Sequence, residues 1–149
     1  MTSRRLILFL MALIPTAALM VGCASTSTSA SGHAGMAMAP LDSLPSDVQT
    51  APVSVRESYQ FAAANPEVLQ ELPCYCGCGA MGHASNYDCY VVGIDAAGAL
   101  QYDPHALGCS ICVDITQDTM RLLREGKTVP EIRTYVDATY ARYGPSNMP

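Results

Sequence analysis

Apolar residues after position 53 recur at a spacing of three or four, and this spacing predicts two helices before Pro73. The first begins at Ser54, because Ser54 and Glu57 form a capping-box pattern in which the hydroxyl and the carboxylate each satisfy a free backbone amide. Its expected apolar face comprises Val55, Tyr59, Ala62 and Ala63. The second helix is short and starts at Asn65, with Pro66 in its first turn.

Two further helices are predicted in the last third of the chain. One covers residues 109–125 and ends at Gly126, a residue typical of helix C-termini. Its expected inward positions are Cys112, Ile115, Thr119 and Leu122. The other opens with a capping box of Thr128 and Glu131 and ends at Gly144. Its apolar positions are Val129, Ile132, Val136, Tyr140 and Tyr143.

A strand pattern occurs between these two pairs of helices. Residues 89–94 are rich in β-branched and aromatic side chains, residues 95–98 have the composition of a turn, and residues 99–102 follow as a second strand. This is at most one short β-hairpin. The expected fold class is therefore mainly α, a small helical domain with a Cys-rich loop.

The start of the chain has the layout of a bacterial lipoprotein signal peptide. Arg4 and Arg5 precede an apolar run over residues 6–21, which is too short for a stable membrane span and contains a proline. Residues 19–23 read Leu-Met-Val-Gly-Cys and resemble a lipobox. Cleavage would make Cys23 the new N-terminus, and acyl chains on it would anchor the protein to the extracytoplasmic face of the cell membrane.

The rest of the chain divides into a linker and one domain. The expected parts are a signal peptide (1–22), a lipidated N-terminus with a flexible tether (23–52) and a Cys-rich domain (53–149). The tether is rich in Ser, Thr, Ala, Gly and Pro and shows no apolar period, so it cannot bury enough surface to offset its chain entropy. His33, Met36 and Met38 could capture copper there, although a low-complexity linker that happens to contain them is the simpler interpretation.

Charge and composition narrow the function further. Two of the eight basic residues and none of the thirteen acidic ones lie in residues 1–22, so the mature chain carries a net charge of −7. This argues against nucleic acid as a partner and against electrostatic binding to anionic lipid heads. The chain has no tryptophan, and Phe61 is its only phenylalanine after the signal peptide. A core this modest favours additional cross-links, either covalent or through a metal.

Candidate chemistry gathers in six cysteines and two histidines. Cys74, Cys76 and Cys78 alternate along the chain, so in an extended segment their three sulfurs would share one face. Gly77 and Gly79 would allow the backbone to turn closely around whatever the sulfurs bind. The remaining members are His83, Cys89, His105 and the C-x-x-C pair Cys109 and Cys112. The pair lies at an expected helix start, where free amides and the helix dipole favour thiolate.

Three interpretations of this set stay open. Thiolate and imidazole select copper(I) or zinc, so the eight residues could form a soft-metal site. An exported domain could instead hold three disulfides, although a two-residue separation strains a disulfide. Cys109 and Cys112 could carry out thiol–disulfide exchange, but that motif is expected beside a βαβ pattern, which the sequence lacks. Asp88 and Asp114 flank cysteines and could orient a histidine, although such acids are more often solvated.

One six-residue motif points to a known family. Residues 73–78 read Pro-Cys-Tyr-Cys-Gly-Cys, and the chain resembles the PCYCGC-motif lipoproteins of bacteria from about Ser58 to Arg142. Within that stretch the resemblance includes Gly82, His83, Asn86, Cys89, Cys109 and Cys112. It implies an exported, lipid-anchored domain and says nothing about activity. From the residues, we expect metal binding or delivery to a partner protein rather than catalysis, because no Ser-His-Asp arrangement or phosphate-binding loop is present.

Overall fold

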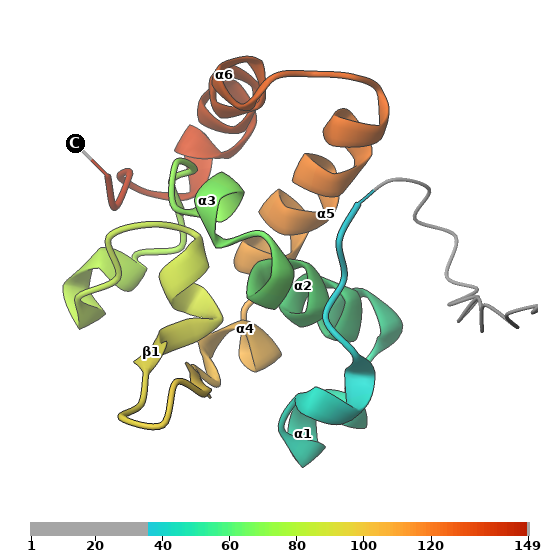
Figure 1. The fold of residues 1–149 in the computed structure, drawn as a ribbon. Helices are drawn as coiled ribbons and strands as arrows, with labels where there is room; N and C mark the ends of the chain where they lie inside the picture. The colour runs from blue at the N-terminus through green and yellow to red at the C-terminus, as the bar shows by residue number, and fades with distance from the viewer. Residues whose placement is uncertain (1–35, 149) are drawn as a thin grey trace, which may run out of the picture. The chain divides into compact units, whose positions relative to one another are not determined.

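A computed structural model describes residues 36–148 of the chain. The predicted signal peptide, Cys23 and His33 lie outside these residues. Three helices form the main body: α2 (Val53–Ala64), α5 (Ser110–Arg124) and α6 (Val129–Tyr140). Helix α5 contacts α2 on one side and α6 on the other (Figure 1). No helix in the described part is long and apolar enough to cross a bilayer.

The core lies along α5, as its apolar spacing predicts. Cys112, Ile115, Thr119 and Leu122 are all buried, and they face buried side chains of α2 and α6. The partners on α2 and α6 include Val55, Tyr59, Phe61, Ala62, Ile132, Val136 and Tyr140. Tyr143, expected on the same face of the last helix, is half exposed because α6 ends at Tyr140 and the short 3-10 helix η4 (Ala141–Tyr143) follows.

Helix ends follow local chemistry at α5 and α6 but not at α2. Thr128 donates its backbone N–H to the Glu131 carboxylate at 2.8 Å, so the predicted capping box is confirmed. Gly126 closes α5 with a φ of +80°, where a side chain would be strained. The capping box predicted at Ser54 is wrong: α2 begins one residue earlier, after Pro52, so Ser54 lies inside the first turn. Its carbonyl there accepts a hydrogen bond from the Ser58 hydroxyl.

Residues 36–52 are part of the fold, although the sequence analysis assigns them to a flexible tether. Leu44 lies between the 3-10 helix η1 (Leu41–Ser43) and helix α1 (Ser46–Gln49), and Val48 lies within α1; they are 4% and 2% exposed. Burial of these two apolar residues offsets part of the entropy cost of ordering the segment. Met36 and Met38 pack partly buried against the core.

The remaining elements position the cysteines. Helix α3 (Pro66–Leu69) is followed by a long loop with two 3-10 turns, η2 (Cys78–Met81) and η3 (Tyr87–Cys89). Strands β1 (Val91–Ile94) and β2 (Leu100–Tyr102) form the predicted antiparallel hairpin, with an irregularity between Val91 and Gly93. Helix α4 (His105–Gly108) then leads into α5. The mainly helical fold class with one hairpin is confirmed for the described residues.

Candidate metal centre

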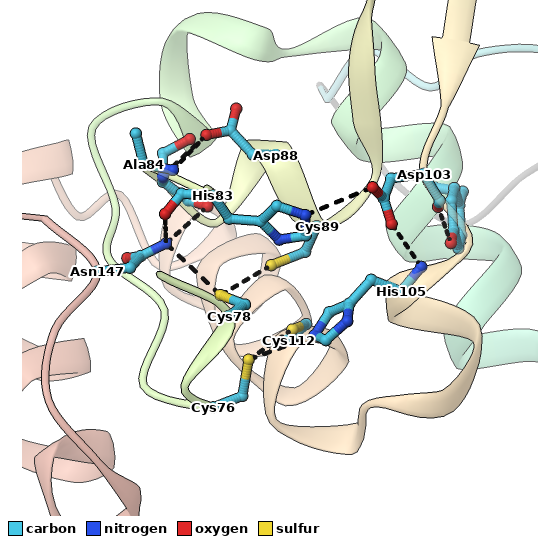
Figure 2. Close-up of polar contacts among 12 residues, drawn as sticks. Cys76, Cys78, His83, Ala84, Asp88, Cys89, Asp103, His105, Cys112 and Asn147 are labelled. Carbon is cyan, nitrogen blue, oxygen red and sulfur yellow. Dashed lines mark hydrogen bonds and ion pairs between the residues drawn. The ribbon is translucent and has the colours of Figure 1, made fainter. Parts of the chain in front are cut away.

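All eight predicted ligands converge at the N-terminal end of α5. Their side-chain donor atoms form three overlapping groups, and within each group every atom lies within 4.8 Å of the others. The groups are Cys74, Cys76, Cys78 and Cys89; Cys76, His105, Cys109 and Cys112; and Cys78, His83, Cys89 and His105. Figure 2 shows side chains from the Cys-rich loop and from the α4–α5 region pointing toward one another. The predicted meeting of the two cysteine clusters is confirmed.

Three sulfurs form the closest part of this arrangement. The Cys74 sulfur lies 3.4 Å from that of Cys76 and 3.4 Å from that of Cys112, and the Cys76 and Cys112 sulfurs are 3.6 Å apart. All six cysteines of the described part are free thiols. Thiolates around one zinc-like ion at about 2.3 Å would be separated by about 3.8 Å, the edge of the tetrahedron, so only small shifts would admit an ion.

The loop reaches this geometry through a turn rather than an extended strand. Gly77 adopts a left-handed φ of +86°, and Cys78 then begins the 3-10 turn η2. Cys78 therefore turns toward Cys89, whose sulfur is 3.6 Å from its own. Tyr75, between Cys74 and Cys76, is buried and donates its hydroxyl to Asp137 on α6 at 2.7 Å.

The second half of the site is held by the turn into α4 and by the start of α5. Cys109 is the N-cap residue of α5, and Cys112 lies in its first turn, fully buried. The Asp103 carboxylate accepts the His105 backbone N–H at 2.7 Å, which fixes the turn that presents the imidazole. The His105 Nε2 then lies 3.4 Å from the Cys76 sulfur.

His83 shows the most informative polar contact in the site. Its Nε2 lies 3.4 Å from the Asp103 carboxylate, while its Nδ1 is buried without a hydrogen-bond partner. Asp103 is itself held in place: its carbonyl accepts the Tyr59 hydroxyl at 2.6 Å and its N–H donates to the Tyr90 carbonyl at 2.8 Å. A carboxylate on one imidazole nitrogen directs the other nitrogen toward a metal.

Asp103 takes the orienting role for which the sequence analysis considered Asp88 and Asp114. Asp88 instead accepts the backbone N–H groups of Ala84 and Ser85 at 2.6 and 3.1 Å and so shapes the loop. Asp114 is exposed on α5. The one local signal for Asp103 is its place two residues before His105, a spacing typical of an Asx turn.

Asn147 is the second residue that sequence reasoning missed. Its Oδ1 accepts the Cys74 N–H at 2.7 Å, and its backbone N–H donates to the Cys74 carbonyl at 3.1 Å. Its Nδ2 lies within 3.6 Å of the Cys78 sulfur and near the carbonyls of His83 and Ser85 (Figure 2). The C-terminal segment therefore ties both arms of the Cys-rich loop together. No sequence motif predicts this contact.

Mutual contact and burial push the thiol pKa values apart. The hydrogen bond from the Cys112 thiol lowers the pKa of Cys74 well below its ordinary value. The same contact raises the pKa of Cys112, and burial raises the pKa values of Cys76 and Cys78. Without a cation, negative charge on the Cys74 sulfur thus disfavours ionisation of Cys76, Cys78 and Cys112 beside it. A soft cation would allow several to ionise together.

The arrangement favours metal ligation over the two other interpretations. Cys74 has two sulfur neighbours at the same distance, as expected around a shared guest rather than for a pairwise cross-link. Cys112, the inner member of the C-x-x-C pair, lies 3.4 Å from the Cys74 sulfur and 3.6 Å from the Cys76 sulfur, so the pair is part of a larger sulfur cluster rather than an isolated redox pair. The donor set of six sulfurs and two imidazoles can hold soft metal ions.

Comparisons with known proteins agree with the motif. Residues 11–149 match the model of a family described as proteins of unknown function with a PCYCGC motif. Neither the curated proteins nor the solved structures contain a match to the chain. Cys74, Cys76 and Cys78 of the motif supply three of the eight converging donors. The chain therefore belongs to the PCYCGC-motif family.

Proposed function

We propose that this protein binds soft metal ions, copper(I) or zinc, through the eight converging Cys and His side chains. It would do so as a lipid-anchored domain outside the cytoplasmic membrane, where it takes up ions and passes them to a partner protein. The lipobox-like residues 19–23 support an anchor at Cys23. The family match begins at residue 11, within the apolar run, and therefore includes these residues.

The observation that carries the proposal is the unpartnered Nδ1 of His83. A buried polar nitrogen without a partner costs about 1–3 kcal/mol, a cost that native structures rarely accept without a functional reason. His83 shares a donor group with Cys78, Cys89 and His105, while Asp103 occupies its other nitrogen. A metal ion among these donors would satisfy the nitrogen and neutralise thiolates at the same time.

The donor types define the class of ion. Calcium and magnesium require oxygen ligands, whereas the atoms gathered here are sulfur and imidazole nitrogen. Zinc takes four such ligands in a tetrahedron, and copper(I) readily shares thiolates between neighbouring ions. The acidic surface of the mature chain would suit attraction of cations rather than anions.

The direct test is elemental analysis of the full chain, purified from expressing cells without chelator or reductant. We expect zinc or copper to copurify, and to be released when the thiols are alkylated. Intact mass measured under denaturing conditions should correspond to six free thiols. A mass lower by six hydrogen atoms, with no bound metal, would show three disulfides and refute the proposal.

A matched pair of histidine variants tests the site itself. His83→Ala removes a predicted ligand, whereas His33→Ala removes a histidine that lies before the described part of the chain. We expect reduced metal content or affinity only for His83→Ala. Equal retention by both variants would place the metal elsewhere.

A further inference from the structure

We infer that the cluster is divided into two unequal metal sites, and that only the outer ion exchanges readily with other molecules. This inference rests on the proposed metal-binding function. The inner site consists of Cys74, Cys78, Cys89 and His83, and the outer site consists of Cys76, His105, Cys109 and Cys112. The exchange partner would be a thiolate or imidazole ligand of another molecule, because those donors match the ones that the outer ion would leave.

The distances among the donors allow this division, with Cys76 and His105 close to both sets. The outer four form one complete group in which every donor atom is within 4.8 Å of the others. In the inner set, the sulfurs of Cys74, Cys78 and Cys89 lie within this distance of one another, and His83 lies within it of both Cys78 and Cys89. Each set thus provides four donors, the number that a tetrahedral soft-metal site needs. Cys74 also contacts Cys76 and Cys112, which places its sulfur between the two sites.

The two sets differ in burial. Cys74, Cys78 and Cys89 are 0–2% exposed, and the His83 side chain is 10% exposed. In the outer set only Cys112 is fully buried, while Cys76, His105 and Cys109 are of intermediate exposure. An incoming ligand can therefore reach three of the four outer donors without the fold opening, whereas the three inner sulfurs are covered by protein.

The two sets also differ in how firmly their members are held. In the inner set, Asp103 orients His83, and Asn147 contacts both Cys74 and Cys78. Such contacts around the ligands retain a bound metal. Cys109, in contrast, lines a surface groove of about 290 Å³ between the start of α2 and the α4–α5 junction, beside Val55 and Leu107. Through this groove a ligand can approach Cys109, the one outer donor that lines it.

The exchange step needs no oxidant or reductant. An incoming thiol binds the outer ion through its sulfur, the bond between the ion and the Cys109 sulfur breaks, and the proton of the incoming thiol passes to the Cys109 thiolate. Repetition at Cys76 and His105 completes the transfer, with Cys112 as the last ligand because it is the most buried. The oxidation state of the ion does not change.

The test uses the full chain loaded with zinc, and in a second arm with copper(I), followed by extraction with an excess of a colorimetric chelator. We expect two ions per chain that leave in two phases of equal amplitude. The rates should differ roughly 10- to 100-fold, the range over which loss of surrounding contacts changes metal affinity. After the fast phase, alkylation and peptide mapping should find Cys76 and Cys109 modified and Cys78 and Cys89 protected.

Two variants complete the experiment. Cys109→Ser should retain one ion and lose the fast phase, and because Cys109 is only partly buried this change should leave the fold intact. Ser110→Ala, at the adjacent exposed position, should behave as the wild type. Release of both ions in one phase, a single ion in the wild type, or loss of both ions from Cys109→Ser would overturn the two-site inference while metal binding stands. A wild-type chain that binds neither zinc nor copper(I) would instead refute the proposed function itself.

Discussion

Asn147 offers the sharpest test of how the metal centre is held together. It lies two residues from the end of the chain, yet it contacts both arms of the Cys-rich loop. Replacing it with alanine removes one bond to its Oδ1, from the Cys74 N–H, and two bonds from its Nδ2 hydrogens, which are shared among the Cys78 sulfur and the carbonyls of His83 and Ser85.

The magnitude follows from these contacts. Three hydrogen bonds, each contributing a net of about 1 kcal/mol, set an upper value near 3 kcal/mol, and the partial exposure of Asn147 reduces this to about 2 kcal/mol. With a urea m-value of about 2 kcal/mol/M, typical of small domains, Asn147→Ala should lower the midpoint of unfolding by about 1 M. Weaker metal binding would act in the same direction, because a ligand of the native state stabilises it.

The assay is urea unfolding of the full chain at a fixed concentration of free zinc, followed by circular dichroism. Thr134→Ala is the control, because the exposed Thr134 hydroxyl bonds to the Pro130 carbonyl within α6, away from the Cys-rich loop. We expect Thr134→Ala to unfold close to the wild type. If Asn147→Ala also unfolded at the wild-type midpoint with an unchanged m-value, the C-terminal tie would have no energetic role.

Three further predictions concern other parts of the structure. Asp103→Asn should weaken zinc binding by roughly 10- to 100-fold in a chelator competition, because His83 loses its charged partner; Asp95→Asn, which alters an aspartate of the hairpin turn, should leave the affinity unchanged. Leu44→Ala should lower the free energy of unfolding in urea by about 2–5 kcal/mol, because Leu44 is buried in the core. A change near zero would show that residues 36–52 do not contribute to the core. Glu131→Gln should lower stability at neutral pH, because hydrogen bonds at Thr128 lower the pKa of Glu131 and the ionised form stabilises the native state. That difference should vanish as the pH falls through this lowered pKa, and a constant difference in Tm across an acid titration would contradict it.

The helices show which features of the fold are local. The C-terminal end of α5 depends on Gly126, and the N-terminal end of α6 depends on Thr128 and Glu131. These interactions span three residues or fewer, so these two ends can be predicted from the sequence. Ser54 and Glu57 carry the same capping pattern, but Pro52 already starts the helix there, and the pattern lies within the first turn. The capping-box pattern at Ser54 therefore fails because the helix has already begun at Val53, so Ser54 cannot be its N-cap.

The tether boundary shows a different limit. Leu41, Leu44 and Val48 recur at a spacing of three and four residues, a short helical period that the Pro-, Ser- and Ala-rich composition of the segment obscures. The burial of Leu44 and Val48 depends on α2, against which α1 packs. The composition of residues 36–52 cannot show that α2 will provide the surface against which they pack.

The sequence by itself determined the candidate ligands and the kind of chemistry they offer, because eight sulfur and imidazole side chains are visible without a fold. It also determined the helical class, since apolar spacing is a local property. Only the tertiary structure decided that these donors meet, which ones are buried, and that Asp103 and Asn147 contact them. The physical reason is distance along the chain: Asn147 acts on Cys74 across 73 residues, and such a contact exists only once the helices have packed and brought the chain end back over the loop.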